Sequence, residues 1–144
     1  MAEITLNKAR MIIRTALKHA RENALQPIAV VVLDAGGHVK AFEREDGASF
    51  YRFQVAHGKA HGAIGMGLGS RALHNRAEAQ SYFLLSVAAL EGTAVVPVPG
   101  GVLVRDRRGA LIGAVGISGD RSEADEAAAM AGIEAAGFTA DAGG

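Results

Sequence analysis

The stretch VLVRDRRGALIGAVGIS, residues 102–118, decides the fold, because it predicts two strands joined directly by a tight turn. Its two ends, residues 102–106 and 110–118, are apolar and rich in β-branched residues, which is typical of strands. Between them, Asp106 and Gly109 take the first and fourth positions of a type I turn. Strands joined in this way are antiparallel, so we expect an antiparallel hairpin with no helix between its strands.

An earlier segment repeats this pattern. Residues 27–34, PIAVVVLD, predict a short buried strand, and residues 38–45, HVKAFERE, predict its partner. Asp34 and Gly37 stand at the same two turn positions as the aspartate and glycine of the later hairpin. Ordinary hairpin chemistry explains this shared spacing as well as an internal repeat does.

Helical periodicity surrounds both hairpins. Apolar residues recur at helical spacing from Leu6 to Ala20, and Thr5 before them is a suitable N-cap. The helices predicted from such patterns cover residues 5–25, 49–67, 75–91 and 122–137. We expect residues 139–144 to fray. The order α-ββ-αα-ββ-α predicts an α+β fold with a central antiparallel sheet flanked by helices, and residues 1–144 suit one domain.

Composition excludes several classes of function. The 15 basic and 15 acidic residues cancel, so the net charge gives no electrostatic basis for binding nucleic acid. Cysteine is absent, which excludes disulfides, thiolate metal ligands and a cysteine nucleophile. No apolar run approaches the ~18 residues that a membrane span needs, and the first residues lack the apolar core of a signal peptide. We therefore expect a cytoplasmic protein that neither enters a membrane nor binds nucleic acid.

Glycine is abundant, with 19 residues, and it occurs inside predicted strands and helices. Gly113, Gly116 and Gly119 weaken a strand unless a neighbour approaches the backbone closely. A phosphate at the following helix start is disfavoured, because that start carries several carboxylates. Ser122 and Asp125 instead suggest a helix cap of the capping-box type. The strand glycines therefore indicate close packing rather than a phosphate site.

Residues 53–67, FQVAHGKAHGAIGMG, place glycines on one face of a predicted helix and alanines on the other. Each glycine inside a helix costs about 1 kcal/mol relative to alanine, so Gly58, Gly62 and Gly65 predict a compensating close contact. The contact could be another backbone segment, a partner subunit or a flat ligand. A broken helix is the alternative interpretation.

The same segment carries titratable candidates. His57 and His61 are four residues apart, a spacing that can present two imidazoles to one metal, but the glutamate of the zincin motif is missing. One of them could instead bind haem iron or carry a proton, or both could simply be hydrogen-bonded. Lys59 on the other flank could hold a carboxylate as a point charge, or be solvated. Arg44, Ser70 and Arg71 are further polar candidates at loop edges, and arginine suits carboxylate binding.

Four stretches of the sequence resemble a known family when they are taken together, although each one alone is weak. They are residues 30–49, 56–73, 98–119 and 123–135. In order and spacing they resemble the GlcG/HbpS-like family of haem-binding or haem-degrading domains, which also form the C-terminal domain of PduO-type proteins. The resemblance implies a profilin-like α+β domain that assembles into dimers and higher homo-oligomers, often octamers. It also implies a pocket near the PGG loop, which corresponds here to Lys59, Gly100, Gly101 and Ser118.

The leading hypothesis is noncovalent binding of haem or a related planar ligand, with His57 or His61 as the iron contact. The alternative is a small enzyme, an isomerase or lyase, that binds an organic carboxylate through Lys59 or Arg44 and uses His57 as acid and base. A third hypothesis is that the protein is an assembly factor that binds no ligand. The candidate catalytic residues are His57 and Lys59, and the candidate ligand-binding residues are Arg44, Phe53, His57, Lys59, His61, Ser70, Arg71, Gly100, Gly101 and Ser118.

Overall fold

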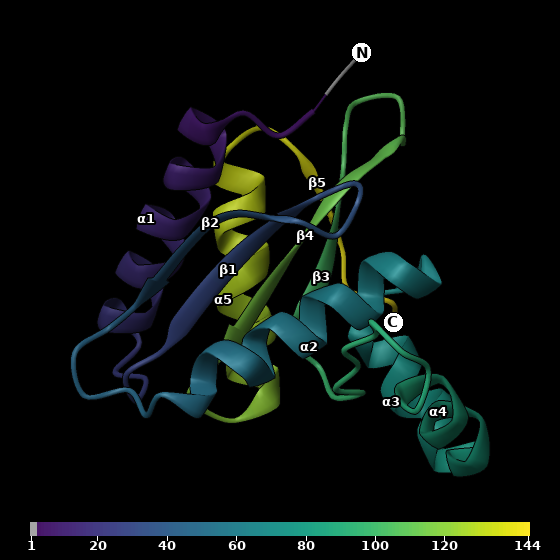
Figure 1. Ribbon diagram of the computed structural model, residues 1–144. Coiled ribbons are helices and arrows are strands. Elements are labelled where there is room, and N and C mark those ends of the chain that lie inside the picture. Colours follow the sequence, from purple (N-terminus) through teal and green to yellow (C-terminus); the bar gives the residue numbers. More distant parts are fainter. Residues whose placement is uncertain (1–2) are drawn as a thin grey trace.

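The computed structural model describes residues 3–144, in which five antiparallel strands form one sheet of order β2-β1-β4-β3-β5 (Figure 1). The strands are β1 (Ala29–Asp34), β2 (Val39–Arg44), β3 (Gly101–Arg105), β4 (Leu111–Ser118) and β5 (Thr139–Asp141). Both predicted turns are confirmed, since the Gly37 and Gly109 amides donate to the Asp34 and Asp106 carbonyls at 3.0 Å. Pairing of β1 with β4 places the two hairpins side by side, and the predicted α+β class is confirmed.

Helices cover the two faces of this sheet unequally. Helices α1 (Leu6–Glu22) and α5 (Ser122–Ala135) pack on one face, and α2 (Tyr51–Met66) lies across the other (Figure 1). Helices α3 (Ser70–Ala79) and α4 (Ser81–Ala88) follow α2 and extend away from the sheet. Within residues 3–144, no helix is both long and apolar enough to cross a bilayer.

Strand alternation sorts the core into two layers. Val30 and Val32 of β1 join the cluster beneath α1 and α5, whereas Val31 and Leu33 join the cluster beneath α2. This division follows from the two-residue period of a strand, and it explains why 27–34 has no polar position among its central residues.

Two predicted elements are wrong. The single helix expected over 75–91 is in fact α3 and α4, because the chain leaves helical geometry at Gln80, with φ −144° and ψ 65°. Most of the predicted linker before residue 75 belongs to α3. The tail expected to fray contains β5, which pairs with β3 through Leu103 and Asp141. A three-residue strand has too little periodicity to be found from sequence, and it forms because the edge of β3 offers unpaired backbone groups.

The two predicted helix caps have different outcomes. The Thr5 hydroxyl accepts the Lys8 amide at 3.1 Å, which confirms the N-cap of α1. Ser122 is not the N-cap of α5, because Arg121 holds that position and makes no side-chain cap bond. Asp125 turns inward rather than towards solvent, and only 1% of it is exposed.

Helix α2 lies unusually close to β4. A Cβ atom at Gly116 would collide with the Ala56 carbonyl and lie 2.9 Å from the Ala60 Cβ, so the close packing predicted at this strand glycine is confirmed. On the outer side of α2, a Cβ at Gly58 would lie 2.5 Å from Val96 Cγ2. The close contact at Gly58 is therefore made by another segment of the same chain. Within residues 3–144 nothing lies within 4 Å of the missing Cβ of Gly65, so no contact inside the chain compensates this glycine.

We predict opposite effects of filling two of these positions. Gly116→Val forces α2 away from β4 and should lower the free energy of unfolding by about 3 kcal/mol or more. Gly65→Ala meets only open space and should raise it by about 0.5–1 kcal/mol through helix propensity. Urea denaturation followed by circular dichroism measures both changes. A Gly116→Val protein as stable as the parent would contradict the close approach.

Candidate functional site

Four aromatic rings, which we call the aromatic strip, lie along one flank of α2 and the neighbouring strand. Phe53, His57 and His61 are spaced by four residues, so they share this flank. Their rings stack, with centroids 5.6 Å apart for Phe53 and His57 and 5.1 Å apart for His57 and His61. Phe42 of β2 meets Phe53 edge-on, with centroids 4.7 Å apart and planes at 80°. The structure thus brings together three predicted site residues and adds Phe42.

The strip is partly open because α2 packs on β1, β3 and β4 and extends little over its own side of the edge strand β2. All four rings are half-buried. Three large apolar side chains on the same elements are exposed, at 48% for Val39 of β2 and at 69% and 66% for Phe50 and Tyr51 at the start of α2. The strip is therefore a partly exposed aromatic surface that contains two imidazoles.

The two histidines differ in what their nitrogens contact. His61 Nδ1 lies 3.2 Å from the Ala94 carbonyl oxygen and 3.3 Å from the Ala94 amide nitrogen. The hairpin turn lies beside the other edge of the ring, since a Cβ added at Gly37 would be 3.4 Å from His61 Nε2. Within residues 3–144 the His57 ring makes no hydrogen bond, which leaves both its nitrogens available to a ligand.

Burial also controls the charge of His57. Its desolvation is the main cause that lowers the pKa of His57 below the ordinary 6.5, and the neighbouring charge of His61 lowers it further. The imidazole is therefore neutral at pH 7, and the neutral form is the one that binds a metal ion. Within the described part of the chain, no three metal-ligating side chains gather closely enough to hold an ion by themselves.

A second polar cluster surrounds Lys59 at the carboxyl end of β4. Lys59 Nζ donates to the Ile117 carbonyl at 2.9 Å and to Asp125 Oδ2 at 3.2 Å. Asp125 Oδ1 in turn accepts the Asp120 amide at 3.0 Å. Lys59 is 2% exposed and Asp125 1%, so this ion pair is buried between α2 and the first turns of α5.

Burial works against both charges of this pair. Desolvation lowers the pKa of Lys59 and raises the pKa of Asp125, although the attraction between the two groups opposes each shift. The good geometry and the extra hydrogen bonds to Ile117 and Asp120 are what allow a buried ion pair to persist.

Several predicted pocket residues join this interior cluster. The Gly101 amide donates to Ser70 Oγ at 2.7 Å, and a Cβ at Gly100 would lie 2.8 Å from Lys59 Nζ. Ser118 Oγ accepts from Arg52 at 3.0 Å. Lys59, Ser70 and Ser118 are buried, so a carboxylate would have to displace Asp125 to reach the ammonium group.

The remaining predicted residues lie elsewhere. Arg44 is exposed and donates to the Ala48 carbonyl at 3.2 Å. Arg71 forms a bidentate ion pair with Glu126, with both contacts at 3.0 Å. His57 and Lys59 are about 200° apart around α2, so the structure does not bring the two candidate catalytic side chains together.

Sequence reasoning missed Asp125 and Arg52. Asp125 stands three and four residues before Ala128 and Ala129, which are fully buried on α5. This helical spacing in the sequence indicates that the Asp125 carboxylate points inward and needs a cationic partner. No comparable pattern marks Arg52, because its partner Ser118 is distant in sequence.

The described arrangement matches known proteins over most of its length. A family model described as "Haem degrading protein HbpS-like" matches residues 4–134. A crystal structure of a PduOC–haem complex superposes with a TM-score of 0.84 and 27% identity, covering 95% of this chain and 97% of that chain. A double mutant of HbpS from Streptomyces reticuli superposes with a TM-score of 0.79 and 27% identity, covering 93% and 87%.

A more distant structure, the Klebsiella pneumoniae protein ORFY, shares the fold, with a TM-score of 0.81 and 24% identity over 95% of this chain and 93% of that chain. No curated protein matches the chain in sequence.

We predict that the two members of the buried pair are strongly coupled. Lys59→Met leaves Asp125 as an uncompensated buried carboxylate and should cost about 3–5 kcal/mol of unfolding free energy. The double variant Lys59→Met, Asp125→Asn should lose clearly less than the sum of the single variants. A double-mutant cycle by urea denaturation measures this, and additive losses would contradict the coupling.

The direction in which the pKa of Asp125 shifts decides how the stability of Lys59→Met depends on pH. Without its cation, Asp125 has a folded-state pKa raised above the unfolded value of 3.8, so the folded protein binds the extra proton. The stability of Lys59→Met should therefore be greatest in acid and fall as the pH rises through that raised pKa. Denaturation midpoints from about pH 4 to 8 measure the trend.

Proposed function

Because the chain belongs to the HbpS-like family, we propose that it is a small-molecule-binding protein that holds haem, or a related planar ligand, noncovalently on the aromatic strip. The solved PduOC structure, similar over most of this chain, is a haem complex and supports this proposal. His57 is the proposed iron contact, and Phe42 and Phe53 supply apolar surface for the macrocycle.

The availability of His57 is the observation that carries the proposal. Its ring is half-buried between Phe53 and His61, and within residues 3–144 its nitrogens have no hydrogen-bond partner. Histidine nitrogen is a common axial ligand of haem iron, and the lowered pKa of His57 keeps the ring in the ligating form. His61 is the weaker candidate, because its Nδ1 already contacts the backbone of Ala94.

A second copy of the chain completes the proposed site. Ligand pockets cover roughly 70–90% of a bound molecule, whereas the aromatic strip is open on one side. The exposed apolar side chains of Val39 on β2 and of Phe50 and Tyr51 at the start of α2 support an interface that involves these elements. We propose a homo-oligomer, from a dimer up to an octamer, and a cytoplasmic location as expected from the sequence.

A haemin titration followed by absorbance tests the iron contact. The parent protein should give a saturable shift of the Soret band, and His57→Ala should weaken binding by about tenfold or more, a loss of ~1.4 kcal/mol at least. His61→Ala should have the smaller effect. His74→Ala on α3 is the matched control, because this half-exposed histidine faces Glu78 and lies outside the strip. Equal affinities of the parent and His57→Ala would overturn the assignment.

The pH dependence of haemin binding gives an independent test. A proton competes with iron for His57, and the pKa of His57 lies below 6.5. Affinity should therefore begin to decline only at a lower pH than it would for an iron contact with an ordinary imidazole pKa. In His61→Ala the decline should begin at a higher pH, because one cause of the lowered pKa is gone. Identical profiles for the two proteins would show that His57 does not titrate at the site.

A further inference from the structure

We propose that a second ligand site, separate from the aromatic strip, binds a small carboxylate anion at the amino end of α2. A hollow of about 290 Å³ opens there between residues 26–27, the 47–49 loop, Gly119 and Arg52. Its size is close to the lower end of the roughly 300–1,000 Å³ typical of ligand pockets, which suits a ligand of a few heavy atoms.

Arg52 is the group that gives this hollow its chemistry. Its half-buried guanidinium donates from Nη1 to Ser118 Oγ at 3.0 Å and makes no other hydrogen bond or ion pair within residues 3–144. Arg71 and Arg105, which line another hollow, each pair with a carboxylate at 3.0 Å. Arg52 thus differs from these arginines in having unused donors in a fork that matches a carboxylate.

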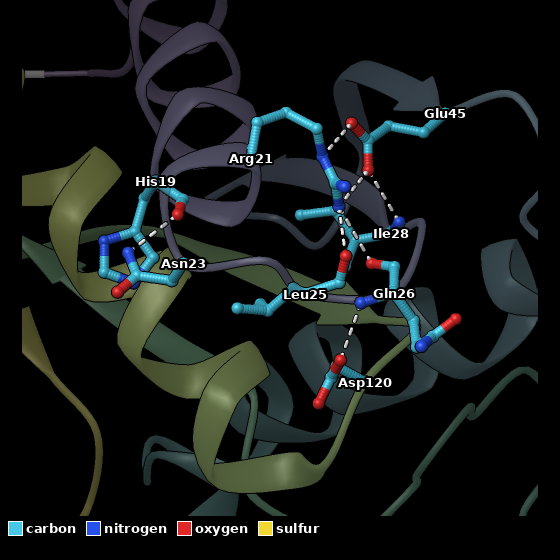
Figure 2. Close-up of polar contacts among 8 residues, drawn as sticks. All are labelled: His19, Arg21, Asn23, Leu25, Gln26, Ile28, Glu45 and Asp120. Atoms are coloured by element: carbon cyan, nitrogen blue, oxygen red, sulfur yellow. Dashed lines mark hydrogen bonds and ion pairs between the residues drawn. The ribbon is translucent and has the colours of Figure 1, made fainter.

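Glu45 and Asp120, on segments that border the hollow, are already engaged by other groups, as Figure 2 shows. Glu45 pairs with Arg21 at 3.1 Å and accepts the Ile28 amide at 2.9 Å. Asp120 accepts the Gln26 amide at 2.7 Å. These contacts hold both carboxylates in place, and within residues 3–144 neither forms an ion pair with Arg52.

The backbone around the hollow also favours a negatively charged ligand. The first turn of α2 contains no acidic residue, and its N-cap, Phe50, makes no side-chain cap bond. The positive end of this 16-residue helix therefore adds to the charge of Arg52. Ser49 also lines the hollow, where its hydroxyl can donate to a carboxylate oxygen.

The proposed anion site is independent of haem binding. Arg52 and Phe53 are about 100° apart around α2, and Arg52 points towards Ser118 while Phe53 points towards Phe42. An anion at Arg52 therefore does not cover the aromatic strip. Experiments can refute either proposed site without refuting the other.

A titration of the full chain with sodium acetate, followed by amide chemical shifts, tests the proposal. Sodium phosphate and sodium chloride at equal ionic strength are titrated in parallel. Acetate should shift the amide signals of Gly47, Ser49 and Gly119 in a saturable way. Arg52→Gln should weaken acetate binding about tenfold or more, because it removes a charge-assisted pair. Arg14→Gln, which alters an exposed arginine on α1, is the matched control and should bind as the parent does.

Several results would overturn the proposal. Chloride shifts equal to those of acetate would show only a general salt effect, and tighter saturable binding of phosphate would reject the carboxylate assignment. Unchanged affinity in a folded Arg52→Gln would exclude Arg52. If that variant does not fold, Arg52→Lys keeps the charge but loses the fork, and its affinity for acetate should fall several-fold. Unchanged affinity in Arg52→Lys would overturn bidentate binding.

Discussion

The contact between the backbone of α2 and strand β4 at Gly116 is the constraint on which the rest of the structure depends. A side chain there would meet the Ala56 carbonyl, so the helix can lie this low only over glycine. Ala56, Ala60 and Ala63 then form its buried face, because larger side chains would also lift the helix. With that face fixed on the sheet, the helical period dictates which side chains leave α2 on each flank.

The two flanks have different chemistry as a result. On the flank next to the edge strand, Phe53, His57 and His61 stack and meet Phe42 over a partly open apolar surface. On the other flank, Arg52 and Lys59 point towards the end of β4, where Ser118 and Asp125 receive them. One short helix therefore separates a flank of stacked aromatic rings from a flank that carries Arg52 and the buried Lys59.

The buried pair of Lys59 and Asp125 connects the two helical layers. It joins α2 to α5 at the carboxyl end of β4, and both groups lose hydration there. A hydrophobic pair in this place could give equal stability, so the ion pair is a poor source of net stability. Its geometry instead fixes how α2 and α5 sit relative to each other, since both partners must meet within hydrogen-bond distance.

The sequence by itself determined the elements that follow from local chemistry: the two hairpins, whose Asp and Gly residues define the turns, and the helices with a clear 3.6-residue period. It also placed the histidines on one helical flank, because spacing alone decides this. Only the tertiary structure decided that Asp125 faces Lys59, that residues 139–141 form a strand, and that Arg52 has no carboxylate partner within residues 3–144. Each of these depends on atoms distant in sequence, and a local pattern contains no information on which distant group will be near.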